Sequence, residues 1–204
     1  MAQITNGIRA ILSHPFIYSS FQLLMGARML WQDFAATSIR PFPGMQILDI
    51  GCGPADILAY LPDVDYWGFD ISEKYINHAR TKYGKRGHFH CQTLQLTDLA
   101  QLPLFDIVLA LGLLHHLDDP TAESIMQLAF QALKSGGLLL TIDPCLQPSQ
   151  NRMARFLICH DRGQNVRNKY GYQAIAKSCF LDPEIVVRHK VWVPYTHCLM
   201  KCQK

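Results

Sequence analysis

The sequence predicts an α/β fold: a mostly parallel, seven-stranded sheet with helices on both faces and an antiparallel hairpin at its C-terminal end. Three observations support this prediction. Short apolar segments alternate with helical segments over residues 46–143, which is typical of a parallel sheet covered by helices. The apolar segment 46–50 runs directly into a Gly-x-Gly turn at 51–53, as at a sharp strand-to-helix junction. A second apolar segment ends in Asp70, 19 positions after Gly51.

The expected elements of the parallel part follow in chain order. Residues 15–40 have apolar side chains at helical spacing and precede Pro41, so they predict a helix or a helix pair before the first strand. The predicted strands cover 46–50, 65–70, 88–92, 106–111 and 138–143, and the predicted helices between them cover 55–61, 73–83 and 119–134.

The C-terminal part of the chain has a different pattern. Residues 145–169 show no clear period. A helix is expected near 170–180, and strands are expected at 184–192 and 195–202. Because Pro194 separates these two strands, we expect them to form a hairpin that closes the sheet.

Length and composition indicate one domain with a sizeable core, since the 204 residues are 49% hydrophobic. We expect an N-terminal helical lid over 1–43, a ligand-binding core over 44–143, a substrate-side insertion over 144–169, and a C-terminal helix and hairpin over 170–204. The alternative for the N-terminal helix is a packing role at the edge of the sheet.

Charge and cysteine content narrow the class of protein. A net charge of +3 is too small to indicate nucleic-acid binding by itself. The seven cysteines are odd in number and lie mostly in apolar runs, which favours a reducing, cytoplasmic environment over a disulfide framework. Cys198 and Cys202 share one face of a predicted strand, where core packing is favoured over metal binding, and we predict no metal. No apolar run is long enough to span a bilayer, and the N-terminus lacks a signal-peptide pattern.

The Gly-x-Gly turn fits two kinds of ligand: a nicotinamide or flavin dinucleotide, and S-adenosylmethionine (AdoMet). A dinucleotide fingerprint has a third glycine where this chain has Asp56, and that carboxylate would repel the pyrophosphate. Asp49, at the end of the first strand, adds a second acid. AdoMet has no phosphate and carries a positive sulfonium and a positive amino group, so acids beside this turn favour AdoMet.

The chain resembles the class I AdoMet-dependent methyltransferases of the small, single-domain kind, which have a Rossmann-like fold. Four motifs carry the resemblance in register over roughly residues 44–143: ILDIGCG at 47–53, GFDIS at 68–72, FDIVLALGLLHHL at 105–117 and LKSGGLLL at 133–140. The sequence departs from the family pattern at Ala55, where members usually have a third glycine, and at 91–94, where many have an acid near the adenine.

The resemblance implies where AdoMet binds. Gly51 and Gly53 let the backbone approach the methionine part, Asp49 lies near its amino group, and Asp70 accepts hydrogen bonds from both ribose hydroxyls. Thr93 or backbone groups hold the adenine amino group. The further residues expected at the cofactor are Cys52, Ile71, Leu94, Leu111 and Gly112. For Asp49, a loop or helix cap is the alternative.

Two histidines are the candidate catalytic residues. In open α/β sheets ligands bind beyond the carboxyl ends of the strands, and His115 and His116 follow the fourth strand there. Histidine titrates near neutrality and suits a general base for a hydroxyl or amine acceptor. Adjacent residues after a strand generally point different ways, and the resemblance favours His116 as the inward one. The alternatives are rim histidines that bond backbone, or a metal site without an evident carboxylate cluster.

Basic residues are dense in segment 152–167, where the resemblance places substrate-binding insertions. Arginine suits carboxylate or phosphate recognition, so we expect a small anionic acceptor; a solvated surface loop is the alternative. The candidate substrate contacts are Tyr18, Arg152, Arg162, Arg167, Tyr195 and His197.

The sequence therefore predicts methyl transfer from AdoMet to a small, anionic molecule, with S-adenosylhomocysteine as the other product. Methylation of RNA or protein is an alternative, although nucleic acid is disfavoured because the basic segment lacks several interleaved aromatics. An inactive AdoMet-binding scaffold protein is the third possibility.

Overall fold

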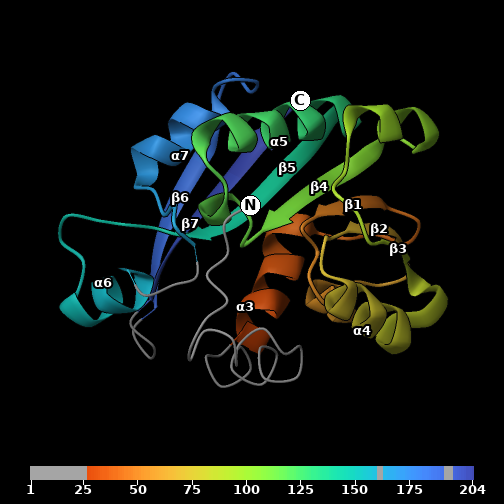
Figure 1. The fold of residues 1–204 in the computed structure, drawn as a ribbon, viewed down its shortest axis with the longest axis horizontal. Coiled ribbons are helices and arrows are strands. Elements are labelled where there is room, and N and C mark those ends of the chain that lie inside the picture. Colours follow the sequence, from red (N-terminus) through yellow and green to blue (C-terminus); the bar gives the residue numbers. More distant parts are fainter. Residues whose placement is uncertain (1–26, 160–162, 191–194) are drawn as a thin grey trace.

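The computed structural model describes residues 27–159, 163–190 and 195–204, with the backbone alone for Ala27, Arg28 and Lys190. Its centre is a seven-stranded sheet with the strand order β3-β2-β1-β4-β5-β7-β6 (Figure 1). The strands are β1 (Gln46–Ile50), β2 (Asp65–Phe69), β3 (His88–His90), β4 (Phe105–Leu111), β5 (Leu133–Pro144), β6 (Glu184–Lys190) and β7 (Tyr195–Gln203).

Strand direction confirms the predicted fold class. Strands β1 to β5 pair in parallel, whereas β7 is antiparallel to both β5 and β6. Because β6 and β5 are both antiparallel to β7, β6 has the same direction as the parallel strands. The strand order reverses between β1 and β4, and in such sheets this switch point is where ligands bind.

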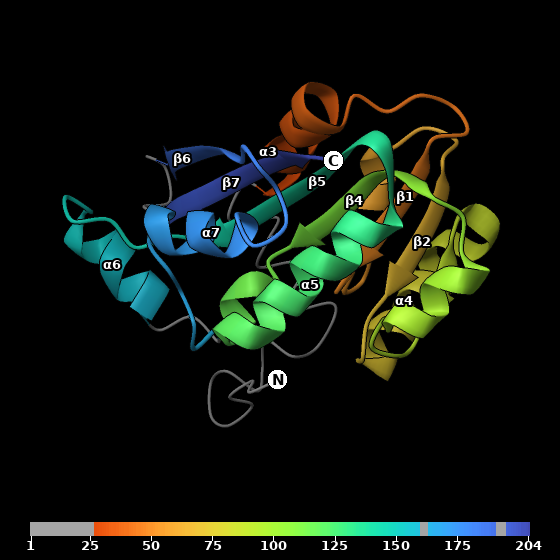
Figure 2. The same ribbon diagram turned by 90° about the horizontal axis from the view of Figure 1, so that it is seen from above.

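Helices cover both faces of the sheet, as predicted. The helices are α3 (Ala27–Phe34), α4 (Glu73–Tyr83), α5 (Asp119–Ala132), α6 (Arg152–Cys159) and α7 (Lys169–Ala176). Helices α5 and α7 lie over one face, and α3 and α4 lie over the other (Figures 1 and 2). Helix α6 lies beyond the end of the sheet, on the side of β6 and β7 (Figure 1).

The strands are apolar on both sides because both faces of the sheet are covered. Neighbouring residues of one strand point to opposite faces, so they enter two separate core clusters. In β1, Ile47 and Leu48 are both fully buried, one in each cluster; in β4, Ile107 and Val108 divide in the same way. The two cores hold the central strands rigidly, and with them the loops at their carboxyl ends.

Local signals explain why α4 and α5 begin where they do. The Ser72 side chain accepts a hydrogen bond from the backbone N–H of Tyr75, which caps α4. Asp118 caps α5 by accepting from the N–H of Thr121, and Pro120 lies in its first turn. Both caps follow directly on strand-end loops, so the start of each helix borders the ligand-binding edge.

The structure differs from the predicted elements in type at several places and in the bounds of others: β3 ends at His90, β5 begins at Leu133, and α7 ends at Ala176. Instead of an α-helix over 55–61 there is a short 3₁₀ helix, η2 (Asp56–Tyr60), which stops ahead of Pro62. Residues 145–169, for which the sequence predicted no element, contain helix α6. With eight residues, α6 is too short to show a helical period in the sequence. Within the predicted helix 15–40, α3 continues into the π-helix η1 (Ala35–Ile39), and residues 15–26 lie outside the described residues.

Candidate active site

A cavity of about 390 Å³ opens at the switch point of the sheet, a size typical of small-ligand sites. It lies beyond the carboxyl ends of β1, β2, β3 and β4. Its main walls are the strand ends and loops at residues 49–54, 69–72, 92–94, 111–113 and 116–117. All ten residues that the sequence predicted at the cofactor line this one cavity: Asp49, Gly51, Cys52, Gly53, Asp70, Ile71, Thr93, Leu94, Leu111 and Gly112.

The loop after β1 exposes its backbone to this cavity. Gly51 and Gly53 have positive φ values of 73° and 53°, a region that favours glycine. A Cβ added at Gly53 would meet no protein atom within 4 Å, whereas one at Gly51 would lie 2.8 Å from Leu113 Cδ1. A side chain at Gly53 would therefore extend into open space beside the ligand position. Ala55 is also left-handed, with φ 56°, which explains why glycine suits this position.

Asp70 ties two loops of the cavity together. Its carboxylate accepts from the backbone N–H of Gly53 at 2.9 Å and from that of Ser72 at 2.7 Å. Burial raises the pKa of Asp70, while these two hydrogen bonds favour the ionised form. Each carboxylate oxygen has a further lone pair, so Asp70 retains the capacity to accept from a neighbouring pair of hydroxyls.

Asp49 is buried within β1, and neither a loop nor a helix cap describes its position. Its Oδ2 accepts the hydroxyl of Tyr66 at 2.6 Å, and its Oδ1 is buried with no hydrogen-bond partner among the described residues. Burial raises the pKa of Asp49 to about 7, against the effect of the Tyr66 hydrogen bond and with a smaller contribution from Asp70. Such an atom beside a cavity favours a ligand that brings a donor or a positive charge.

The cavity also has apolar lining residues. Leu94, Leu117 and Ile125 line it, together with Thr93 and Gln92. The Gln92 amide nitrogen donates to Asp98 at 3.3 Å, which leaves its carbonyl oxygen as an acceptor. A flat heterocycle with an exocyclic amino group matches this combination of apolar walls and acceptors.

Several lining residues are not among the cofactor residues that the sequence predicted: Trp31, Ser72, Tyr75, Gln92, Leu113, Leu117, Thr121 and Ile125. Some of them lie at positions that a sequence pattern could have indicated. Ser72 and Tyr75 belong to the cap and first turn of α4, and Thr121 and Ile125 lie one turn apart on α5. Trp31 comes from α3, whose neighbour Phe34 packs in the core, so this helix both covers the sheet and contributes to the cavity wall.

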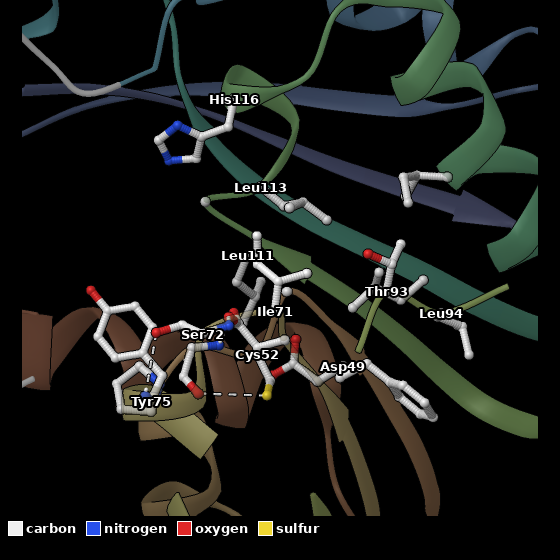
Figure 3. A pocket seen from close by; sticks show the side chains of 18 of the residues that line it. Asp49, Cys52, Ile71, Ser72, Tyr75, Thr93, Leu94, Leu111, Leu113 and His116 are labelled. Atoms are coloured by element: carbon white, nitrogen blue, oxygen red, sulfur yellow. Dashed lines mark hydrogen bonds between the residues drawn. The ribbon is translucent and has the colours of Figure 1, made fainter. Parts of the chain in front are cut away.

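The two histidines have different surroundings. His116 lines the cavity and faces the side that carries Asp49, Ser72 and Tyr75 (Figure 3). The His115 side chain is 7% exposed, does not line the cavity, and places Nδ1 2.8 Å from Asp143 Oδ1. The ring centroids are 3.9 Å apart. The geometry therefore brings His116, and not His115, to the place where a ligand binds; a catalytic role for either remains a prediction.

Arg167 has a supporting position outside the cavity wall. Its guanidinium donates to Asp119 and to the backbone carbonyls of Leu114, Leu117 and Asn165, with all donor–acceptor distances between 2.6 and 2.9 Å. These contacts use all five N–H groups of the side chain. An acceptor anion would have to displace existing contacts, so the structure does not favour the predicted anion-binding role of Arg167.

Three of the other predicted substrate residues, Arg152, Tyr195 and His197, are described by the structure and do not line the cavity. Arg152 is exposed on α6 and does not line it. Tyr195 and His197 lie on β7 with their ring centroids 4.9 Å apart, also outside the lining residues. Tyr18 and Arg162 lie outside the described residues.

The structure also shows the state of the cysteines and the length and polarity of the helices. All seven cysteines are free thiols, and Cys198 and Cys202 pack with Met200 in the core on one face of β7. None of the helices in the described ranges has the length and apolar character needed to cross a membrane.

Comparison with known proteins gives the same assignment as the geometry. Residues 48–139 match the model of a methyltransferase domain family. The chain is 35% identical over 113 residues to a 27-O-demethylrifamycin SV methyltransferase of Amycolatopsis mediterranei, covering 52% of this chain and 41% of the relative. It is 32% identical over 160 residues to an O-methyltransferase of Penicillium expansum, covering 67% of this chain and 55% of the relative. The chain thus spans about half the length of these curated relatives.

The fold also matches solved structures. A magnesium protoporphyrin IX methyltransferase from Synechocystis PCC 6803, solved with bound SAM, superposes with a TM-score of 0.58 at 18% identity. The match covers 92% of this chain and 82% of that one. Family model, relatives, fold and the register of four motifs agree, and the chain belongs to the class I S-adenosylmethionine-dependent methyltransferases.

Proposed function

We propose that this chain binds AdoMet in the described cavity and catalyses transfer of its methyl group to a small-molecule acceptor. AdoMet supplies a methyl group activated by attachment to a positive sulfonium. The observation that carries the proposal is the pair of acids at the ends of β1 and β2. Asp49 has a buried oxygen without a hydrogen-bond partner among the described residues, and Asp70 lies beside the Gly51–Gly53 loop. This pair suits a cationic nucleoside and opposes a pyrophosphate.

Each part of the cavity has a proposed task. Asp70 accepts from the ribose hydroxyls, and the glycine loop admits the methionine part close to the backbone. Asp49 receives the amino group, whose positive charge favours the ionised carboxylate. Leu94, Leu117 and the polar groups of Gln92 and Thr93 hold the adenine. These residues hold the donor in one orientation, and positioning of this kind can lower a barrier by about 7–11 kcal/mol.

His116 is the proposed general base. It lines the cavity across from Ser72 and Tyr75 at the start of α4 (Figure 3), and histidine is the side chain whose ordinary pKa lies near neutrality. Removing a proton from the acceptor as it attacks the methyl group typically adds 10²–10⁴-fold to the rate. The names of the two curated relatives support a hydroxyl acceptor on a small molecule.

The anionic character of the acceptor is a separate part of the proposal. Among the described residues that line the cavity, the one lysine or arginine is Lys74, which is exposed. Of the described residues, Lys74 is therefore the one proposed to meet an anionic group in the cavity, and the substrate roles expected of Arg152 and Arg162 stay predictions. A relative named as a tRNA carboxymethyltransferase, 28% identical over 140 residues, keeps RNA as the second candidate acceptor.

Binding and turnover test these statements in sequence. Titration calorimetry should show binding of AdoMet and S-adenosylhomocysteine, and none of NAD at the same concentrations. AdoMet with a radiolabelled methyl group is then incubated with hydroxylated small molecules, with and without carboxylate or phosphate groups, and in parallel with total RNA. Label in the small molecules supports the proposal. Label in RNA alone would replace the acceptor class, and binding of NAD in place of AdoMet would contradict the cofactor assignment.

A further inference from the structure

The turn that carries His116 is held by a chain segment from far along the sequence. This turn, η5 (Leu114–His116), follows β4, and the segment 163–168 lies against it. The backbone N–H of Asn165 donates to the carbonyl of His115 at 2.9 Å. Arg167 Nη1 donates to the carbonyl of Leu114 at 2.8 Å, and Nη2 donates to that of Leu117 at 2.7 Å. The carbonyls on both sides of His116 are therefore fixed by one segment.

The sheet holds the same turn from the other side. Asp143, near the end of β5, accepts from the backbone N–H of His115 at 3.1 Å and contacts its Nδ1 at 2.8 Å. Gly163 packs against the His115 ring so closely that an added Cβ would overlap it. His115 is thus enclosed between β5 and the segment 163–168, and its neighbour His116 is directed to the cavity.

The guanidinium geometry explains why an arginine occupies this position. Nε and Nη2 both donate to Asp119 Oδ1, at 2.9 and 2.6 Å, and the remaining N–H groups reach three separate carbonyls. A planar fork fixes all these directions at once, whereas a lysine ammonium has three donors and no fixed plane. The Asp119 side chain is 72% exposed, so its ion pair contributes little, and the carbonyl contacts carry the effect.

We propose that Arg167 is a positioning residue of the methyl-transfer site: it holds the η5 turn in the one conformation that presents His116 to the cavity. This proposal rests on the proposed function for the role of His116, but the conformation of the turn can be measured without turnover. It also means that segment 163–168 is coupled to His116 through the backbone of the η5 turn.

The test uses amide hydrogen exchange and the imidazole NMR signals of the full chain without ligand. The His116 and Leu117 amides donate within the turn, to Leu113 and Leu114, so they report its stability. In Arg167→Met, these two amides should exchange at least tenfold faster and the His116 imidazole signals should shift. The β4 and β5 amides should keep their rates.

Three further variants separate the effect of the Arg167 guanidinium on the turn from effects of charge and of surface ion pairs. Arg167→Lys should be intermediate, since it retains the charge and loses the fork. Asp119→Asn should change the exchange rates less than twofold. Arg188→Met removes an exposed surface ion pair with Asp33 and is the matched control, with no expected effect.

Clear results would overturn the proposal. Native exchange at His116 and Leu117 in Arg167→Met, or faster exchange spread equally over the sheet, would show that Arg167 does not position this turn. If Arg167→Met does not fold, Arg167→Lys decides by the same criteria. Failure of the native protein to bind S-adenosylhomocysteine would contradict the proposed function instead, and would leave the exchange result standing. Once an acceptor is known, Arg167→Lys should lower kcat while the KM for AdoMet changes less than threefold.

Discussion

The hydroxyl of Tyr66 donates to Asp49 Oδ2 across 2.6 Å, and the second carboxylate oxygen of Asp49 is buried with no hydrogen-bond partner in the part of the chain that the structure describes. One acid at the cavity floor is thus half satisfied by the protein. A buried polar atom without a partner is unfavourable for the folded state, and a cationic ligand would remove that penalty. Stability of the ligand-free protein and affinity for the ligand should therefore depend on Asp49 in opposite directions.

Asp49→Asn should stabilise the ligand-free protein at high pH. Burial raises the pKa of Asp49 from 3.8 to about 7, so the folded state holds the proton more tightly than the unfolded state. The native carboxylate is then destabilising above pH 7, by about 4 kcal/mol at most, and this penalty disappears as the pH falls toward 4. Denaturant unfolding of both proteins at pH 5 and pH 8 measures the difference. A stability gain of equal size at both pH values would contradict this assignment.

The same substitution should weaken binding of S-adenosylhomocysteine, which retains the amino group. Near pH 6.5 the native protein should release part of a proton as it binds this ligand, because the amino group favours the ionised carboxylate. Calorimetry in buffers with different ionisation enthalpies measures this release. Asp49→Asn should show none, and equal release by both proteins would assign the proton to another group.

Asp70→Ala should weaken AdoMet binding by about 10²–10⁴-fold. Two hydrogen bonds to a carboxylate are lost, at about 1.5–3 kcal/mol each. The substitution also frees the N–H groups of Gly53 and Ser72, so Asp70→Asn, which keeps one acceptor, should be intermediate. Titration calorimetry gives the affinities, and Asp63→Ala, at an exposed position away from the cavity, is the control. An unchanged affinity in Asp70→Ala would remove the ribose assignment.

Gly53→Ala should abolish ligand-induced stabilisation while the protein still folds. The new Cβ meets no protein atom within 4 Å, so the cost to the free protein is the strain of a positive φ, about 1–2 kcal/mol. Gly44→Ala has the same kind of strain and open space, in the turn before β1, and is the matched control. Melting temperatures with and without AdoMet separate the two effects. A full ligand-induced shift in Gly53→Ala would show that the backbone approach at this residue is wrong.

His116→Gln should lower kcat by about 10²–10⁴-fold at neutral pH and remove the acid limb of the pH profile. A general base is inactivated by protonation, so the native rate should fall as the pH drops below the pKa of the base. Initial rates between pH 5 and 9, with the acceptor found in the label-transfer screen, give both quantities. His88→Gln, on the outer strand β3, is the control. A native kcat in His116→Gln would mean that positioning alone supports the transfer.

Local sequence patterns were sufficient for the fold and the cofactor loops. Apolar runs that end in glycine or acid predicted β1, β2 and β4, because a strand buried on both faces needs a continuous apolar segment. The parallel arrangement then brings the strand ends to one edge, so Asp49, Gly53 and Asp70 had to lie together. Helix α6 was not predicted, because eight residues contain too few turns to show a helical period in the sequence.

Only the tertiary structure decided which partner each polar side chain takes. His115 and His116 are neighbours in sequence, but Asp143, 28 positions away, draws His115 into the protein. From the sequence, Arg167 is a candidate for anion binding. In the folded protein its five N–H groups donate to Asp119 and to the backbone carbonyls of Leu114, Leu117 and Asn165. Periodicity and composition record which side chains are buried. The direction of a hydrogen bond depends on backbone segments that meet only after the chain has folded, and the sequence alone contains no local signal for that meeting.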